Sequence, residues 1–202
     1  MQVVFPWAPD VGGSSGIQKG QRYEVWARVA TLAAGRNRGS WFLPDVGDEV
    51  LVSFEAGHPS RPVVVGALWN GVDTPPVAAA AGNHSKVLRT RTGSEIRFND
   101  QAGHETVEIR TAAGQSVLLT SEDGGTARIE DGHHGSVTLT PAGITLQTAS
   151  SVEIKASAIT LQAAAVHLNS ALVKCDGVLQ SDSLITNAVV AASYTPGAGN
   201  VW

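Results

Sequence analysis

Pairs of apolar residues separated by one residue recur along the second half of the chain. Counted from the first member of one pair to the first member of the next, the steps are 11, 10, 10, 10, 7, 8, 7, 7 and 7 residues. The pairs are Ile96/Phe98, Val107/Ile109, Val117/Leu119, Ala127/Ile129, Val137/Leu139, Ile144/Leu146, Val152/Ile154, Ile159/Leu161, Val166/Leu168 and Val173/Cys175. Each pair lies on one face of a short strand, because successive side chains point to opposite faces. A short repeat of strand and corner predicts a solenoid or β-helix.

The number of inward residues per repeat decides between one chain and several. With two inward residues per strand, a single wound chain would bury little surface and expose unpaired strand at both ends. Three chains wound about one axis would bury the narrow faces together and pair each strand with a neighbouring chain. We therefore expect a trimeric β-prism or triple-stranded β-helix. The shortening of the repeat from 10 to 7 residues predicts a shaft that narrows toward its C-terminus.

The first part of the chain has a different composition, and its pattern also predicts strands. Residues 1–73 hold 8 of the 11 aromatic residues. Apolar and polar residues alternate over 25–30 and 50–55, and further short strands are expected at 3–5 and 61–69. About five strands without a helix pattern favour a small closed barrel, of which the OB-fold is the commonest with that strand count.

The predicted fold class is therefore all-β, an OB-fold barrel followed by an intertwined trimeric needle. A Pro- and Ala-rich stretch separates the two textures. We place the OB-fold collar at residues 1–73, a linker at 74–85, and the β-helix spike with its C-terminal tip at 86–202.

Composition and charge exclude several functional classes. Charged residues make up only 16% of the chain, where about 25% is typical of a soluble domain. A net charge of −4 disfavours a nucleic-acid binder, which carries a basic face. The single cysteine, Cys175, excludes an intrachain disulfide framework, and no apolar run reaches the roughly 20 residues of a membrane span. The first residues lack the features of a signal peptide, which predicts assembly in the cytoplasm.

The histidines and the cysteine are the first candidates for chemistry. His133 and His134 lie in a predicted corner, where a solvated turn is favoured over a metal site that needs three or four converging ligands. The alternation turns His167 outward. Cys175 falls on an inward position, where it is expected to be a small packing residue. We expect no metal and no cofactor.

The remaining candidates also favour a structural reading. Acidic residues next to a glycine turn resemble a catalytic carboxylate pair, but glycosidase chemistry needs two carboxylates opposed across a cleft. These acidic residues are Asp45, Asp48 and Glu49. The spacing of these residues does not indicate a catalytic site, so no enzyme activity is expected. The bases of single-stranded nucleic acid would stack on Trp7, Trp26 and Trp41. Such binding also needs a basic groove for the phosphates, and Arg36 and Arg38 alone do not form one.

Several stretches of the chain resemble a known family. Residues 39–55, GSWFLPDVGDEVLVSFE, are similar to the OB-fold core of contractile-injection spike proteins, and residues 61–71, RPVVVGALWNG, continue the resemblance. Residues 86–98 extend it into the needle. The family comprises the VgrG spikes of type VI secretion, the gpV spikes of contractile phages and the spikes of extracellular contractile particles. The end of the chain, residues 192–202, is most similar to the extracellular-particle branch.

The resemblance implies a homotrimeric spike at the centre of a phage tail-like baseplate. The OB domain would form a collar against hub and inner tube proteins, and the needle would pierce the target cell envelope. Some relatives carry hub domains ahead of the OB fold or a lysozyme domain after it; here only the linker follows, so cell-wall hydrolysis is not expected. The iron-binding His-x-His pair of certain gpV-like tips is absent from this sequence.

The C-terminal end suggests a docking site. Tyr194 and Trp202 are the only aromatic residues after Phe98. They would either cap the open end of the β-helix or bind a PAAR-type tip protein, which related spikes carry there. Two other functions stay open at this point: a trimeric adhesive fibre stalk, and an OB-type binder of single-stranded nucleic acid.

Overall fold

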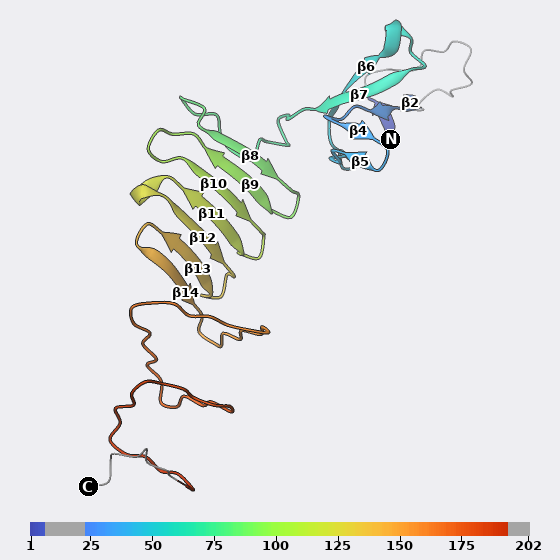
Figure 1. The fold of residues 1–202 in the computed structure, drawn as a ribbon. Helices are drawn as coiled ribbons and strands as arrows, with labels where there is room; N and C mark the ends of the chain where they lie inside the picture. The colour runs from blue at the N-terminus through green and yellow to red at the C-terminus, as the bar shows by residue number, and fades with distance from the viewer. Residues whose placement is uncertain (7–22, 194–202) are drawn as a thin grey trace. The chain divides into compact units, whose positions relative to one another are not determined.

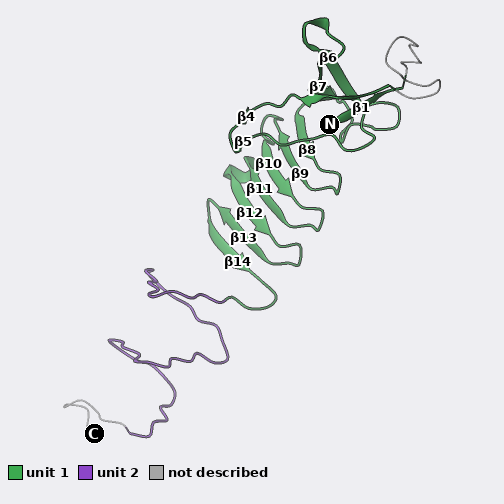
Figure 2. Ribbon diagram, turned by 90° about the vertical axis from the view of Figure 1, so that its right-hand side faces the viewer, with its two compact units in different colours: residues 1–152 green, residues 153–202 purple. Residues whose placement is uncertain are grey.

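The computed structural model describes residues 1–6 and 23–193, and in them the chain is all-β apart from two three-residue 3-10 turns, Glu55–Gly57 and Glu122–Gly124 (Figure 1). The chain divides into two units, Met1–Val152 and Glu153–Trp202 (Figure 2). Within the described residues, no helix is long and apolar enough to cross a membrane. The all-β class predicted from the sequence is confirmed.

Short strands surround a small aromatic and aliphatic core in the first part of the chain. Val3, Phe5, Ala27 and Val64 are buried there, and the Phe5 ring lies 5.7 Å from that of Tyr23. The strands are β1 (Gln2–Phe5), paired with β2 (Tyr23–Trp26); β3 (Arg28–Val29), β7 (Pro62–Ala67) and β6 (Val50–Phe54) in one sheet; and the hairpin of β4 (Ala34–Gly35) and β5 (Arg38–Gly39). Because the described strands form three separate small sheets, barrel closure stays a prediction.

The second part of the first unit is a seven-stranded antiparallel meander in which each strand pairs with the next (Figure 1). Its strands are β8 (Ser85–Arg89), β9 (Glu95–Asn99), β10 (Thr106–Arg110), β11 (Ser116–Thr120), β12 (Thr126–Glu130), β13 (Ser136–Thr140) and β14 (Gly143–Gln147). We expected each strand to pair with a neighbouring chain. For β8–β14 that expectation is wrong, since these strands pair within one chain.

The turns explain why the chain folds back on itself. A ten-residue step holds a five-residue strand and about five residues that reverse the chain. In two of these turns glycine takes a left-handed conformation, with φ +95° at Gly93 and at Gly114. The backbone N–H of Thr90 donates to the carbonyl of Ser94 at 2.8 Å, and that of Thr111 to the carbonyl of Gln115 at 2.9 Å. The glycines between the apolar pairs thus make hairpins of neighbouring strands.

Turns at one edge of the meander stack closely, which gives a first testable prediction. A Cβ added to Gly132, where φ is +77°, would lie 3.2 Å from the carbonyl carbon of Gly114. Gly103 has a similar φ of +80°, but an added Cβ would meet nothing within 4 Å. Gly103→Ala is expected to cost about 1 kcal/mol of unfolding free energy through backbone strain alone, and Gly132→Ala about 2 kcal/mol. Urea unfolding measures both, and equal losses would contradict the stacking.

Residues 148–193 form no strand. Every one of these residues is exposed, including the apolar pairs from Val152/Ile154 to Val173/Cys175. Two ion pairs join residues two apart, Glu153 to Lys155 at 2.9 Å and Lys174 to Asp176 at 2.7 Å. Pairing within the chain therefore ends at Gln147, close to where the repeat shortens to seven or eight residues.

Candidate assembly surface

The register of the meander aligns the apolar pairs into two columns on one face of the sheet. Residues directly opposite each other on neighbouring strands share a face, so each apolar residue lies beside the apolar residue of the next strand. One column consists of Leu88, Ile96, Ile109, Val117, Ile129, Val137 and Leu146. The other consists of Phe98, Val107, Leu119, Ala127, Leu139 and Ile144. We call these two columns the apolar face.

Among the residues that the structure describes, no other element covers the apolar face. Ile129 is 52% exposed and Ile144 is 74% exposed. A contiguous apolar surface of this kind on a soluble protein marks an interaction site. Sequence reasoning identified these residues except Leu88, which it missed because the residue two positions earlier is Lys86 rather than an apolar residue.

The opposite face is mainly polar, and its charges alternate in sign on two strands. Glu95 lies opposite Arg110, and Arg97 lies opposite Glu108. Along β9, Arg97 Nη2 lies 3.2 Å from Glu95 Oε1, and the Glu95 side chain is only 9% exposed. Each charge thus has opposite charges both along its strand and across it. Such a pattern opposes a register slip, which would also bring polar side chains to the apolar face. Sequence reasoning missed it, although Glu-x-Arg recurs in the sequence.

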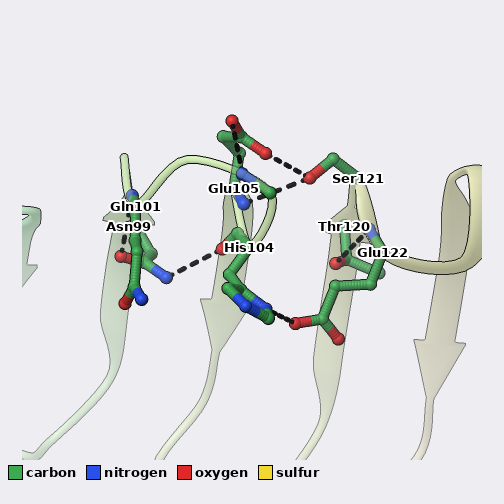
Figure 3. A network of polar contacts seen from close by, with 8 residues as sticks. Asn99, Gln101, His104, Glu105, Thr120, Ser121 and Glu122 are labelled. Carbon is green, nitrogen blue, oxygen red and sulfur yellow. Dashed lines mark hydrogen bonds and ion pairs between the residues drawn. The ribbon is translucent and has the colours of Figure 1, made fainter.

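At one edge of the sheet, polar contacts join two turns, as Figure 3 shows. His104 Nδ1 lies 2.5 Å from Glu122 Oε1, and the backbone N–H of Glu105 donates to Ser121 Oγ at 3.1 Å. The Ser121 hydroxyl also donates to the Glu105 carboxylate. This hydrogen bond is the main reason why the pKa of Glu105 lies below its usual range. The two turns are thereby held in one stack.

The predicted histidine corner is a turn stabilised by its own aspartate. The backbone N–H groups of His133 and Gly135 donate to Asp131 Oδ1 at 2.6 and 2.9 Å. These two bonds hold the pKa of Asp131 below its usual range. Across the described residues, no group of three or more His, Cys, Asp or Glu side chains is placed to hold a metal ion. The corner therefore has the geometry of a turn.

The other candidates do not converge on a site. The backbone N–H of Asp45 donates to Asp48 Oδ2 at 2.8 Å, which fixes a local turn. Glu49 Oε2 accepts from Asn70 Nδ2 at 3.0 Å. The side chains Trp26, Trp41, Arg36, Arg38, His167 and Cys175 are all exposed. Trp7, Tyr194 and Trp202 lie outside the described residues.

Comparisons with known proteins identify the OB segment. Residues 11–69 match the family described as the type VI secretion system/phage-baseplate injector OB domain. The chain is 35% identical over 124 residues to the type VI secretion system spike protein VgrG3 of Vibrio cholerae, covering 59% of this chain and 12% of that protein. It is 31% identical over 113 residues to the spike protein VgrG1a of Pseudomonas aeruginosa, covering 52% of this chain and 18% of that protein.

A third relative carries a toxin name. The actin cross-linking toxin VgrG1 of Vibrio cholerae is 28% identical over 127 residues, which cover 60% of this chain and 11% of that protein. Each match spans less than a fifth of the relative's own length. The resemblance to contractile-injection spike proteins is confirmed, and the chain carries the injector OB domain.

Proposed function

We propose that this chain is a structural spike of a contractile injection baseplate, acting as a homotrimeric needle without catalytic activity. The observation that supports this proposal most is the apolar face, which stays exposed in a single chain. The same apolar pairs continue in the sequence beyond β14. The relatives named spike proteins support this role. A protein that works by shape needs a stiff rod, and a covered apolar face supplies one.

Three copies cover the apolar face. The face is two side chains wide, so three such sheets around one axis enclose a narrow apolar core and leave the charged faces in water. Cyclic symmetry closes this arrangement and leaves no apolar face uncovered. Two sheets packed as a sandwich would also bury the face, and the native mass distinguishes the two arrangements.

Residues 148–193 find their strand partners in neighbouring chains. Their backbone N–H and C=O groups have no ladder within the described part of the chain, and burial of these groups in a trimer would require partners for them. A seven-residue step leaves only about two residues between five-residue strands. The outward residues Glu153 and Lys174 each form an ion pair with the residue two positions further along. In this arrangement residues 1–73 are the collar, 74–85 the linker and 86–202 the spike, in which a prism of three meanders continues into an intertwined β-helix.

The mechanism is mechanical. Contraction of a sheath drives the trimer forward, and the narrow needle concentrates the force on a small area of the target envelope. Hub and inner tube proteins bind the collar end, and the spike travels with the particle after assembly in the producing cell. Interchain hydrogen bonds and the axial apolar core keep one chain from being pulled out alone.

Tyr194 and Trp202 form the docking surface for a PAAR-type tip protein in this proposal. Deletion of residues 194–202 is expected to abolish capture of the tip protein while the native mass of the remaining spike is unchanged. The double variant Tyr194→Ala/Trp202→Ala separates loss of the two rings from loss of the whole segment. Undiminished capture by both variants would contradict docking and leave capping as the role of these residues.

Light scattering of the purified chain, repeated in cold SDS, tests the proposed function. A mass of three chains that persists in detergent is the expected result. A mass of one chain would overturn the proposal, and a mass of two chains would replace the needle by a sandwich. Co-purification of the trimer with baseplate hub protein separates a spike from an adhesive fibre stalk, which would bind no hub.

A further inference from the structure

His134 occupies a turn position that equivalent turns give to glycine. Three turns at one edge of the meander close with the same hydrogen bond, from Thr90 N to Ser94 O, Thr111 N to Gln115 O and Asp131 N to Gly135 O. Their fourth residues are Gly93, Gly114 and His134, with φ of +95°, +95° and +75°. Glycine takes this conformation freely, whereas a side chain there is strained. Strained residues of this kind cluster at functional contacts.

The two edges of the sheet differ in charge. The edge with the turns 90–94, 111–115 and 131–135 carries Arg91, His133 and His134 against one carboxylate, Asp131. We call it the histidine edge. The turns of the other edge, 100–105, 121–125 and 141–142, carry Asp100, Glu105, Glu122 and Asp123 against one histidine, His104. We call it the acidic edge.

Within the described part of the chain, the His134 ring and the Asp123 carboxylate have no hydrogen-bond or ion-pair partner. His134 borders a small hollow with Arg128 and Glu130, but Arg128 Nη2 already pairs with Glu130 Oε1 at 2.5 Å. On the acidic edge, Glu122 pairs with His104. Asp123 thus remains at the tip of its Asp-Gly turn, with φ +53°.

His134 and Asp123 cannot meet within one chain, because a five-residue strand of about 17 Å separates the two edges. In the proposed trimer, on which this inference rests, the histidine edge of each copy runs beside the acidic edge of the next. The turn with Asp123 joins β11 to β12 and the turn with His134 joins β12 to β13, so their heights differ by one strand spacing, about 4.8 Å.

We infer that His134 of one copy binds Asp123 of the next copy. Three such contacts join the edges of neighbouring sheets, and we call each of these junctions a seam of the spike. The partner is a second copy of this chain, and charge complementarity between the two edges selects it. An imidazole N–H donates to the carboxylate, and protonation of the ring adds an ionic attraction. The seam contact also fixes the relative height of neighbouring sheets, which two smooth apolar columns leave free to slide.

Disulfide trapping tests the seam. In a Cys175→Ser background, the double variant Asp123→Cys/His134→Cys is oxidised, boiled in SDS without reductant and run on a gel. The expected product is a covalently linked trimer that reductant returns to single chains. Each single variant is the control and stays a single chain, while a refolded mixture of the two single variants gives linked pairs.

The outcomes separate the seam from the proposed function. A native mass of three chains without the disulfide overturns the seam and leaves the spike intact. A native mass of one chain overturns both. A second measurement avoids new cysteines: His134→Gly relieves backbone strain but removes the contact, so its trimer is expected to dissociate in SDS about tenfold faster than wild type. His133→Gly is the matched control, and unchanged or slower dissociation of His134→Gly would overturn the inference.

Discussion

Replacing Val137 with aspartate is expected to convert the proposed trimer into single chains. Val137 lies on the apolar face, opposite Ile129 on one neighbouring strand and Leu146 on the other. In a three-chain core, three carboxylates would be buried near the axis without cationic partners. An unpaired buried charge costs roughly 3–5 kcal/mol for each chain. Light scattering should therefore report the mass of one chain, or of aggregates, whereas the mass of three chains is expected for wild type.

Thr138→Asp is the matched control for this prediction. Thr138 is the next residue of the same strand, β13, and its side chain lies on the opposite face, beside Arg128 and Thr145. Its substitution imposes a similar loss of strand propensity, at most about 1 kcal/mol, without burying a charge. The trimer should persist. If both variants dissociate, the substitutions act through strand folding, and if neither does, the apolar face is not the assembly surface.

The alternation of apolar and polar residues predicted the meander's faces because side-chain direction in a strand follows from sequence position alone. The columns that contain Ile96 and Phe98 were identified correctly for that reason. The chain that supplies the pairing strand was not predicted correctly, because an exposed strand edge accepts a strand from its own chain as readily as from another. The turns determine that the strands pair within one chain. Gly93 and Gly114 allow the chain to reverse within about five residues, and their left-handed conformation is visible only in the structure.

Contacts between turns also escape prediction from sequence. His104 and Glu122 are 18 residues apart, and they meet because successive strands have equal length and their turns stack at one edge. Equal strand length is a property of the folded meander rather than of any short motif. By contrast, the OB domain was predicted from residues 39–55 and 61–71, since long stretches of matching residues are specific to a family.

Cys175 distinguishes an intertwined shaft from a segment that stays unpaired. In the single chain its thiol is exposed, whereas the apolar pair Val173/Cys175 places it on the inward side of the proposed β-helix. A thiol reagent reaches a buried cysteine only when the structure opens locally. Labelling of native wild type is therefore expected to be at least about 100-fold slower than labelling of the unfolded chain, which corresponds to roughly 2.7 kcal/mol of opening free energy.

The neighbouring residue supplies the control for Cys175. In a Cys175→Ser background, Asp176→Cys puts a thiol on the next position of the same strand, which the alternation turns outward. This variant should label within about tenfold of the unfolded chain, because its sulfur stays in water while the backbone beside it is paired. Equally fast labelling at both positions would mean that residues 152–176 have no partner in the assembled protein. Equally slow labelling would mean that another surface covers both faces of the shaft, which a three-chain needle with a solvated exterior does not allow.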